Sequence, residues 1–154
     1  MTVWRLCKRR HAALDGEGAR LAGGRWNSRG TAVVYASETL SLAALELLAH
    51  CDPALLPDDL VAIPIEIPEG LPARRIDAAG LPRAWRLSPA PESLAQLGDA
   101  WAKGLGSAVL SVPSALVPGE RNFLLNPAHP DFGKISAGRA EKFALDARLA
   151  PARR

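Results

Sequence analysis

The chain has 154 residues, of which 48% are hydrophobic and 23% charged, and its formal net charge is +3. This composition is ordinary for a folded globular protein and excludes a disordered chain or a coiled coil. The length suffices for one domain with one core, and the 13 glycines and 13 prolines argue against a helical bundle. The weak positive charge attracts anions in general, but no motif of a DNA- or RNA-binding module accompanies it.

The predicted elements alternate without a regular period. In chain order, the residue patterns predict strands at 2–6 and 31–36, a helix at 38–51, a strand at 60–68, a helix at 92–104, and strands at 107–114, 121–127, 134–138 and in the tail from 140. Residues 7–30 are expected to form a loop with one helical turn near 10–14, and residues 69–90 an irregular segment. This order predicts a single mixed α/β domain over 1–154, not a doubly wound sheet.

Two boundary residues give more detail. Ser37 is expected to cap the helix at 38–51, with Glu38 in its favourable first turn. Pro64 lacks a backbone N–H, which predicts that its strand lies at a sheet edge or contains a bulge.

The helix at 38–51 contains a single charged residue after its first turn, Glu46. Leu42, Leu45 and Ala49 are spaced as one apolar stripe, and Glu46 lies beside this stripe. Burying a lone carboxylate is costly. Glu46 therefore either faces solvent on an exposed helix face or lies in a cleft, where partial burial would tune its acid–base chemistry.

Arg5 raises the same question in the first strand. It stands between Trp4 and Leu6, and strand alternation turns its side chain to the face opposite theirs. That face is either solvated or part of a polar cleft. In the second case Arg5 would bind an anion, because the forked donors of arginine match phosphate and carboxylate groups.

A glycine- and arginine-rich segment precedes the second strand. Gly23 and Gly24 allow the backbone to approach a ligand closely, and Arg25, Trp26 and Asn27 follow directly. The segment is not the GxGxxG dinucleotide fingerprint, which follows a strand and opens a helix. A tryptophan here is normally a core residue. The tyrosine of the strand that follows belongs either to the core or to a site.

Residues 112–132 hold more special side chains than a plain connection needs. Prolines bracket Ser114, and Asn122, Asn126 and His129 follow. No GxSxG nucleophile elbow is present. Ser114 is expected to present its hydroxyl to a ligand or, alternatively, to cap its own loop. We expect the segment to form one wall of a pocket.

Metal and membrane sites have little support. Cys7 and Cys51 do not make a disulfide framework, and the three histidines lack the spacing of metal ligands. No apolar run reaches the roughly 18 residues that span a bilayer, and the N-terminus lacks the apolar segment of a signal peptide. We therefore expect a cytoplasmic protein with reduced thiols.

Taken together, these segments resemble the RES domain. The resemblance runs in order through nearly the whole chain, in WRL, GEGARLAGGRWNSRGTAVVYAS, SLAALELLAH, GDAWAKG, VLSVPSALVPGERNFLLNPAHPDF and FALDARL. The family takes its name from an arginine, a glutamate and a serine. Glu46 matches the glutamate and Ser114 the serine, while Arg5 and Arg25 both match arginines of the family's site.

The resemblance implies a fold and an activity. The fold is α/β mixed (α+β), with an ADP-ribosyltransferase-like split β-sheet core, flanking helices and a central NAD cleft. The activity is that of a type II toxin–antitoxin toxin, a glycohydrolase or phosphorylase that cleaves the nicotinamide–ribose bond of NAD⁺, depletes NAD and arrests growth. The alternative is a mono-ADP-ribosyltransferase that modifies a protein such as a nucleotide-precursor synthetase.

The resemblance also implies a partner. This is an Xre-like antitoxin that blocks the active-site cleft in a hetero-oligomeric complex and itself binds DNA. Contact of the toxin with DNA would then be indirect, and no membrane is involved. NAD⁺ is the substrate, and no metal is expected.

Catalytic roles are implied for Arg5, Tyr35 and Glu46. Arg5 would also bind the pyrophosphate together with Arg25, and Tyr35 would orient the nicotinamide or its ribose. Glu46 would stabilise the oxocarbenium-like cation as neutral nicotinamide leaves. The predicted NAD⁺-binding set is completed by Trp26, Asn27, Ser114 and Asn126. A non-catalytic binding module is the competing class, and the presence of all these residues speaks against it.

Overall fold

The computed structural model describes residues 1–149. The strands are β1 (Thr2–Lys8), β2 (Val34–Ser37), β3 (Leu60–Glu66), β4 (Ala73–Arg75), β5 (Val109–Pro113), β6 (Arg121–Leu125), β7 (Ser136–Ala137) and β8 (Glu141–Lys142). The helices are α1 (Glu17–Ala22), α2 (Leu40–His50) and α3 (Glu92–Gly104). The strands form one sheet in the order β4-β5-β6-β2-β1-β3-β7, and β8 also pairs with β3.

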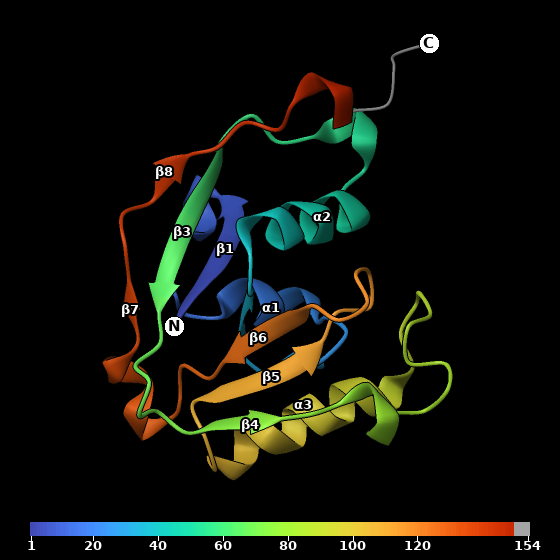
Figure 1. Cartoon of the computed structure of the whole chain (residues 1–154), viewed down its shortest axis with the longest axis vertical. Coiled ribbons are helices and arrows are strands. Elements are labelled where there is room, and N and C mark those ends of the chain that lie inside the picture. Colours follow the sequence, from blue (N-terminus) through green and yellow to red (C-terminus); the bar gives the residue numbers. More distant parts are fainter. Residues whose placement is uncertain (150–154) are drawn as a thin grey trace.

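This sheet is split into two halves at the junction of β1 and β2. The two strands are in register at one pair alone, Trp4 with Ser37. Continued antiparallel register would set Tyr35 opposite Leu6, but the strands separate before that point. Figure 1 shows the result: β1 and β3 run along the long axis of the molecule, whereas β4, β5 and β6 run across it. The predicted mixed α/β class with a split sheet is confirmed.

The core consists of two apolar clusters. The first lies on one face and joins both halves, with Val3, Val34, Ile63, Ile65, Phe123 and Leu125 among its members. The second lies between the β5–β6 half and α3, with Trp26, Leu94, Trp101, Leu110 and Leu124 among its members. A cavity remains between β1, β2 and α2, and its wall includes the core residues Trp26, Val33, Ala36 and Ala43.

The start and the buried face of α2 differ from the prediction. Ser37 does not cap the helix, because it is still paired within β2. Thr39 is the cap: its backbone is extended, and its hydroxyl accepts a hydrogen bond from the Leu42 amide. The predicted stripe is also wrong. Leu42 and its neighbour Ala43 are buried, but Leu45 is 45% exposed, because α2 lies on β1 with a different face.

Two segments that were expected to be irregular form elements. Residues 17–22 make α1, where Glu17 and Arg20 form an ion pair one turn apart. Residues 73–75 make β4, which pairs in parallel with β5. Pro64 lies on β3 between the short stretches that pair with β7 and β8, so its missing N–H leaves no ladder bond unmade.

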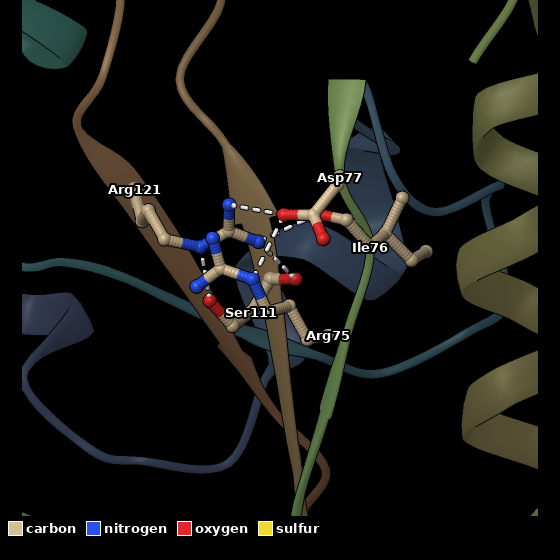
Figure 2. Close-up of polar contacts among 5 residues, drawn as sticks. All are labelled: Arg75, Ile76, Asp77, Ser111 and Arg121. Atoms are coloured by element: carbon tan, nitrogen blue, oxygen red, sulfur yellow. Dashed lines mark hydrogen bonds and ion pairs between the residues drawn. The ribbon is translucent and has the colours of Figure 1, made fainter. Parts of the chain in front are cut away.

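Arg121 links β6 to β5 and to the residues after β4 through hydrogen bonds and an ion pair. Its guanidinium donates to the Ile76 carbonyl at 2.5 Å, the Ser111 carbonyl at 3.0 Å and the Ser111 hydroxyl at 2.6 Å, and it pairs with Asp77 at 3.2 Å. Figure 2 shows this one side chain reaching from β6 across β5 to the residues that follow β4. The next residue, Asn122, points to the opposite face of β6, so the network fixes the strand that presents it.

Candidate active-site cleft

A cavity of about 740 Å³ opens where β1 and β2 separate. We call it the cleft. Its walls come from β1, from α1 and the glycine-rich loop after it, from β2 and from the inner side of α2. The volume lies within the range of small-molecule and cofactor sites. The cleft is therefore a consequence of the split in the sheet.

Glu46 lies in the cleft wall and is held by one of its two oxygens. Its Oε1 accepts hydrogen bonds from Asn122 Nδ2 at 2.6 Å and from the Ser114 hydroxyl at 3.3 Å. Asn122 is oriented in turn by the Ser37 hydroxyl, which donates to its Oδ1 at 2.8 Å. Oε2 of Glu46 has no hydrogen-bond partner within residues 1–149 and remains available to a ligand.

Ser114 lies behind Glu46 and not on the cleft surface. It is 2% exposed, and its hydroxyl accepts from the amides of Leu116 and Val117, each at 3.1 Å. The hydroxyl thus caps its own loop and steadies the carboxylate at once. Of the two roles considered from the sequence, the structure supplies the contacts for capping.

Arg5 bridges the two halves of the sheet at the place where they part. Its Nη1 donates to the Tyr35 carbonyl and its Nη2 to the His11 carbonyl, both at 3.3 Å. Its Nε is buried and lacks a partner within the described residues. A buried N–H without a partner is rare and costly, so this donor is suited to an anion bound in the cleft.

Arg25 stands on the opposite wall. Its Nη1 donates to the carbonyls of Trp85 at 2.6 Å and Leu87 at 3.0 Å. Burial lowers the pKa of Arg25, and the negative charge of Glu46 opposes that shift. Within residues 1–149, neither Arg25 nor Arg5 has a carboxylate at ion-pair distance. The cleft therefore offers two cations to an anionic ligand.

Tyr35 presents its hydroxyl to the glycine-rich loop. The hydroxyl donates to Asn27 Oδ1 at 2.7 Å and accepts from the Trp26 amide at 3.1 Å. Burial raises the pKa of Tyr35 far above its ordinary value, so the phenol is protonated at neutral pH. Gly24 packs against this hydroxyl, and a Cβ atom at Gly24 would lie 2.7 Å from it.

The remaining predicted site residues are buried around the cleft. Trp26 is 2% exposed and belongs to the cluster beneath α3, although it also lines the cleft. Asn27 does not line the cleft, and its amide donates to the carbonyls of Ala19 and Thr31. Asn126 also lies outside the cleft lining and donates to the Ala102 carbonyl at 2.9 Å. These two asparagines anchor loops.

Asn122 is the site residue whose role the sequence did not reveal. It belongs to the segment 112–132, which is rich in special side chains, but its hydrogen bonds to Glu46 and Ser37 depend on strand pairing.

Within residues 1–149, no cluster of three histidine, cysteine or acidic side chains could hold a metal ion. In the same part of the chain, no helix combines the length and apolar character needed to cross a membrane.

Comparisons with known proteins agree on one family. The RES domain model matches residues 2–146. A protein of Sphingobium sp. (strain YBL2) named Prs ADP-ribosylating toxin is 41% identical over 138 residues, 88% of this chain and 86% of that protein. A protein named Toxin Res from Yersinia enterocolitica is 38% identical over 152 residues, 97% of this chain and 99% of that protein. A Toxin Res from Photorhabdus laumondii is 37% identical over the full length of both.

A solved structure shares the fold. It is a chain in the crystal structure of the M. tuberculosis MbcT–MbcA toxin–antitoxin complex, with a TM-score of 0.71 and 20% identity. The match covers 92% of this chain and 83% of that chain. At this identity the likeness concerns the fold alone.

Proposed function

The chain belongs to the RES domain family, and on that premise we propose that it is the toxin of a toxin–antitoxin system and cleaves the nicotinamide–ribose bond of NAD⁺. One observation carries the proposal. Within residues 1–149, Glu46 is fixed through Oε1 with Oε2 free, in a cleft where the guanidinium groups of Arg5 and Arg25 have no carboxylate at ion-pair distance. The toxin names of the relatives support the biological role.

The residues divide the chemistry among them. NAD⁺ carries an anionic pyrophosphate, which Arg5 and Arg25 would bind by charge-assisted hydrogen bonds. The bond to nicotinamide breaks with positive charge developing on the ribose, and the free oxygen of Glu46 would stabilise that charge. Because nicotinamide leaves as a neutral molecule, the site needs no strong general acid. Tyr35 would orient the nicotinamide or its ribose, with its hydroxyl still bonded to Asn27 and to the Trp26 amide.

The acceptor of the ADP-ribose group distinguishes two candidate reactions. Transfer to water or phosphate makes the protein a glycohydrolase or phosphorylase that depletes NAD and arrests growth. Transfer to a protein makes it a mono-ADP-ribosyltransferase. The name of the Sphingobium relative, a Prs ADP-ribosylating toxin, favours keeping this second candidate. Both reactions begin by cleaving the same bond.

A partner follows from the same premise. The structural neighbour was crystallised in a toxin–antitoxin complex, and we propose that this chain likewise binds an antitoxin, of the Xre-like type. The antitoxin would cover the cleft and exclude NAD⁺. Two arginines that form no ion pair within the described part of the chain line the open cleft and suit an acidic or carboxylate-bearing segment of such a partner.

The test measures products from NAD⁺ incubated with the purified chain, freed of any antitoxin, with and without phosphate. Nicotinamide with ADP-ribose indicates hydrolysis, and a phosphate-dependent product indicates phosphorolysis. If nicotinamide appears only when a cell extract is added and ADP-ribose is found on protein, the transferase candidate holds. Absence of nicotinamide under all three conditions would refute the proposal.

A further inference from the structure

Basic residues gather at one end of the cleft, where the proposed chemistry of Glu46 does not use them. Lys8 ends β1, Arg10 and His11 lie in the 3-10 turn that follows, and His50 ends α2. All four line the cleft, and Arg10, His11 and His50 are exposed. We call this group the basic end of the cleft.

The basic end lies beyond the region of Arg5 and Glu46. A strand rises about 3.3 Å per residue, so the backbone of Lys8 lies about 10 Å along β1 from that of Arg5, and the two side chains leave opposite faces of the strand, although both residues line the cleft. His50 is one helical turn, about 6 Å, past Glu46 on α2. A ligand whose reacting ribose meets Glu46 and whose pyrophosphate meets Arg5 would extend its other half toward these residues.

The charges of the basic end are not neutralised by carboxylates of the described residues. Within residues 1–149, neither Lys8 nor Arg10 forms an ion pair with a carboxylate. Arg10 uses its Nε to donate to His11 Nε2 at 3.2 Å, which leaves its terminal nitrogens for a ligand. His50 Nδ1 forms a hydrogen bond with the Glu46 carbonyl at 2.7 Å, and its Nε2 has no partner among the described residues.

We propose that Lys8 and Arg10 form a second phosphate subsite, distinct from the arginines that would take the pyrophosphate, and that this subsite binds a dianionic phosphate group. Lysine and arginine bind such dianions by charge-assisted hydrogen bonds. That group is either the 2′-phosphate on the adenosine half of NADP⁺ or free inorganic phosphate. This assignment rests on the proposed function, because that function places the dinucleotide along the cleft.

The test compares binding of adenosine 2′,5′-bisphosphate and of AMP by calorimetry at constant ionic strength. The wild-type chain should bind the bisphosphate about tenfold tighter or more, the value of one charge-assisted hydrogen bond. The double variant Lys8→Met with Arg10→Gln should lose this preference. Arg9→Gln is the matched control, because Arg9 lies in the same exposed turn but does not line the cleft.

A parallel titration with inorganic phosphate separates the two sources of the phosphate group. Phosphate binding that needs Lys8 and Arg10, without a preference for the bisphosphate, would assign the subsite to free phosphate. If neither ligand depends on Lys8 and Arg10, or if Arg9→Gln has the same effect as the double variant, the subsite does not exist. The probes contain no nicotinamide, so failure of NAD⁺ cleavage is a separate result that refutes only the proposed function.

Discussion

Gly24 and the Tyr35 hydroxyl are in such close contact that no side chain fits between them. A Cβ atom at Gly24 would lie 2.7 Å from Tyr35 Oη and 3.0 Å from Asn27 Oδ1. Gly24→Ala must therefore displace the hydroxyl, and we expect it to lower the free energy of unfolding by about 1–3 kcal/mol and to slow nicotinamide release.

The control for this change is Gly18→Ala. Gly18 also lines the cleft, but a Cβ atom there meets nothing within 4 Å. Because alanine is favoured over glycine in a helix, this variant should be neutral or up to about 1 kcal/mol more stable. Urea denaturation of both variants tests the pair, and equal stabilities would contradict the contact.

Tyr35 gives a prediction for alkaline pH. Burial raises the pKa of Tyr35 in the folded chain, whereas the unfolded chain titrates near the ordinary value of about 10. Above about pH 10 the unfolded chain therefore releases this proton first, and the free energy of unfolding falls as the pH rises. Below that pH the contribution is fully present. Tyr35→Phe should lack this part of the pH dependence.

The measurement is specific because the chain has 1 tyrosine. Tyrosinate absorption should stay absent in the folded protein above pH 10 and should appear when the protein unfolds. Tyr35→Phe also leaves Asn27 Oδ1 and the Trp26 amide without their partner, at a cost of about 1–3 kcal/mol. Free titration of the tyrosine near pH 10 in the folded chain would overturn this description.

The sequence predicted the special position of Glu46 but not the residue that fixes its carboxylate. A lone carboxylate in an apolar helix signals a special position, and Glu46 indeed lines the cleft, which was one of the two alternatives. Its partner Asn122 lies 76 residues away and is brought there by the pairing of β6 with β2. No local pattern carries that information, so the hydrogen bond that fixes the carboxylate could not be predicted.

At the scale of elements, α3 is packed against the glycine-rich loop through Gly98. A Cβ atom at Gly98 would lie 1.6 Å from the Trp26 carbonyl oxygen, which is backbone and cannot rotate away. Gly98→Ala should therefore push α3 off the loop and destabilise the protein by about 3 kcal/mol or more. The expected loss is opposite in sign to the intrinsic helix propensity, which favours alanine over glycine.

Gly104→Ala is the matched control for that prediction. Gly104 ends the same helix, and a Cβ atom there meets nothing within 4 Å. Its stability should stay within about 1 kcal/mol of wild type. Chemical denaturation gives the free energy of unfolding of both variants. A Gly98→Ala protein as stable as wild type would contradict the packing of α3 on the loop.

Elements with a strong local pattern were predicted well. The helix at 92–104 was predicted correctly because its apolar residues Leu94 and Trp101 recur at helical spacing. β4 was missed because its three residues are exposed and depend on β5 and on Arg121 for their place. The face of α2 was wrong because a helix that is apolar nearly all round does not show by spacing which side meets the sheet.

At the scale of the whole molecule, the split of the sheet explains the cleft. β1 pairs with β3 along its whole length but with β2 at one pair, so the edge of β1 from Leu6 onward is left open. Arg5 of β1 lies across the opening and donates to the Tyr35 carbonyl of β2, so its charge lies in the cleft wall. The sequence predicted a mixed α/β domain, the split of the sheet was implied only through the resemblance to the family, and the point at which the sheet divides was not predicted.

The most direct test of the account compares nicotinamide release from NAD⁺ by the wild-type chain and by Glu46→Gln. Glutamine can still accept from Asn122 and Ser114 through its carbonyl oxygen, so the fold should remain, while the negative charge is lost. We expect release to fall about 10²- to 10³-fold. Glu38→Gln removes a carboxylate outside the cleft and should keep full activity. Release by Glu46→Gln at the wild-type rate would contradict the central claim that this carboxylate drives the cleavage.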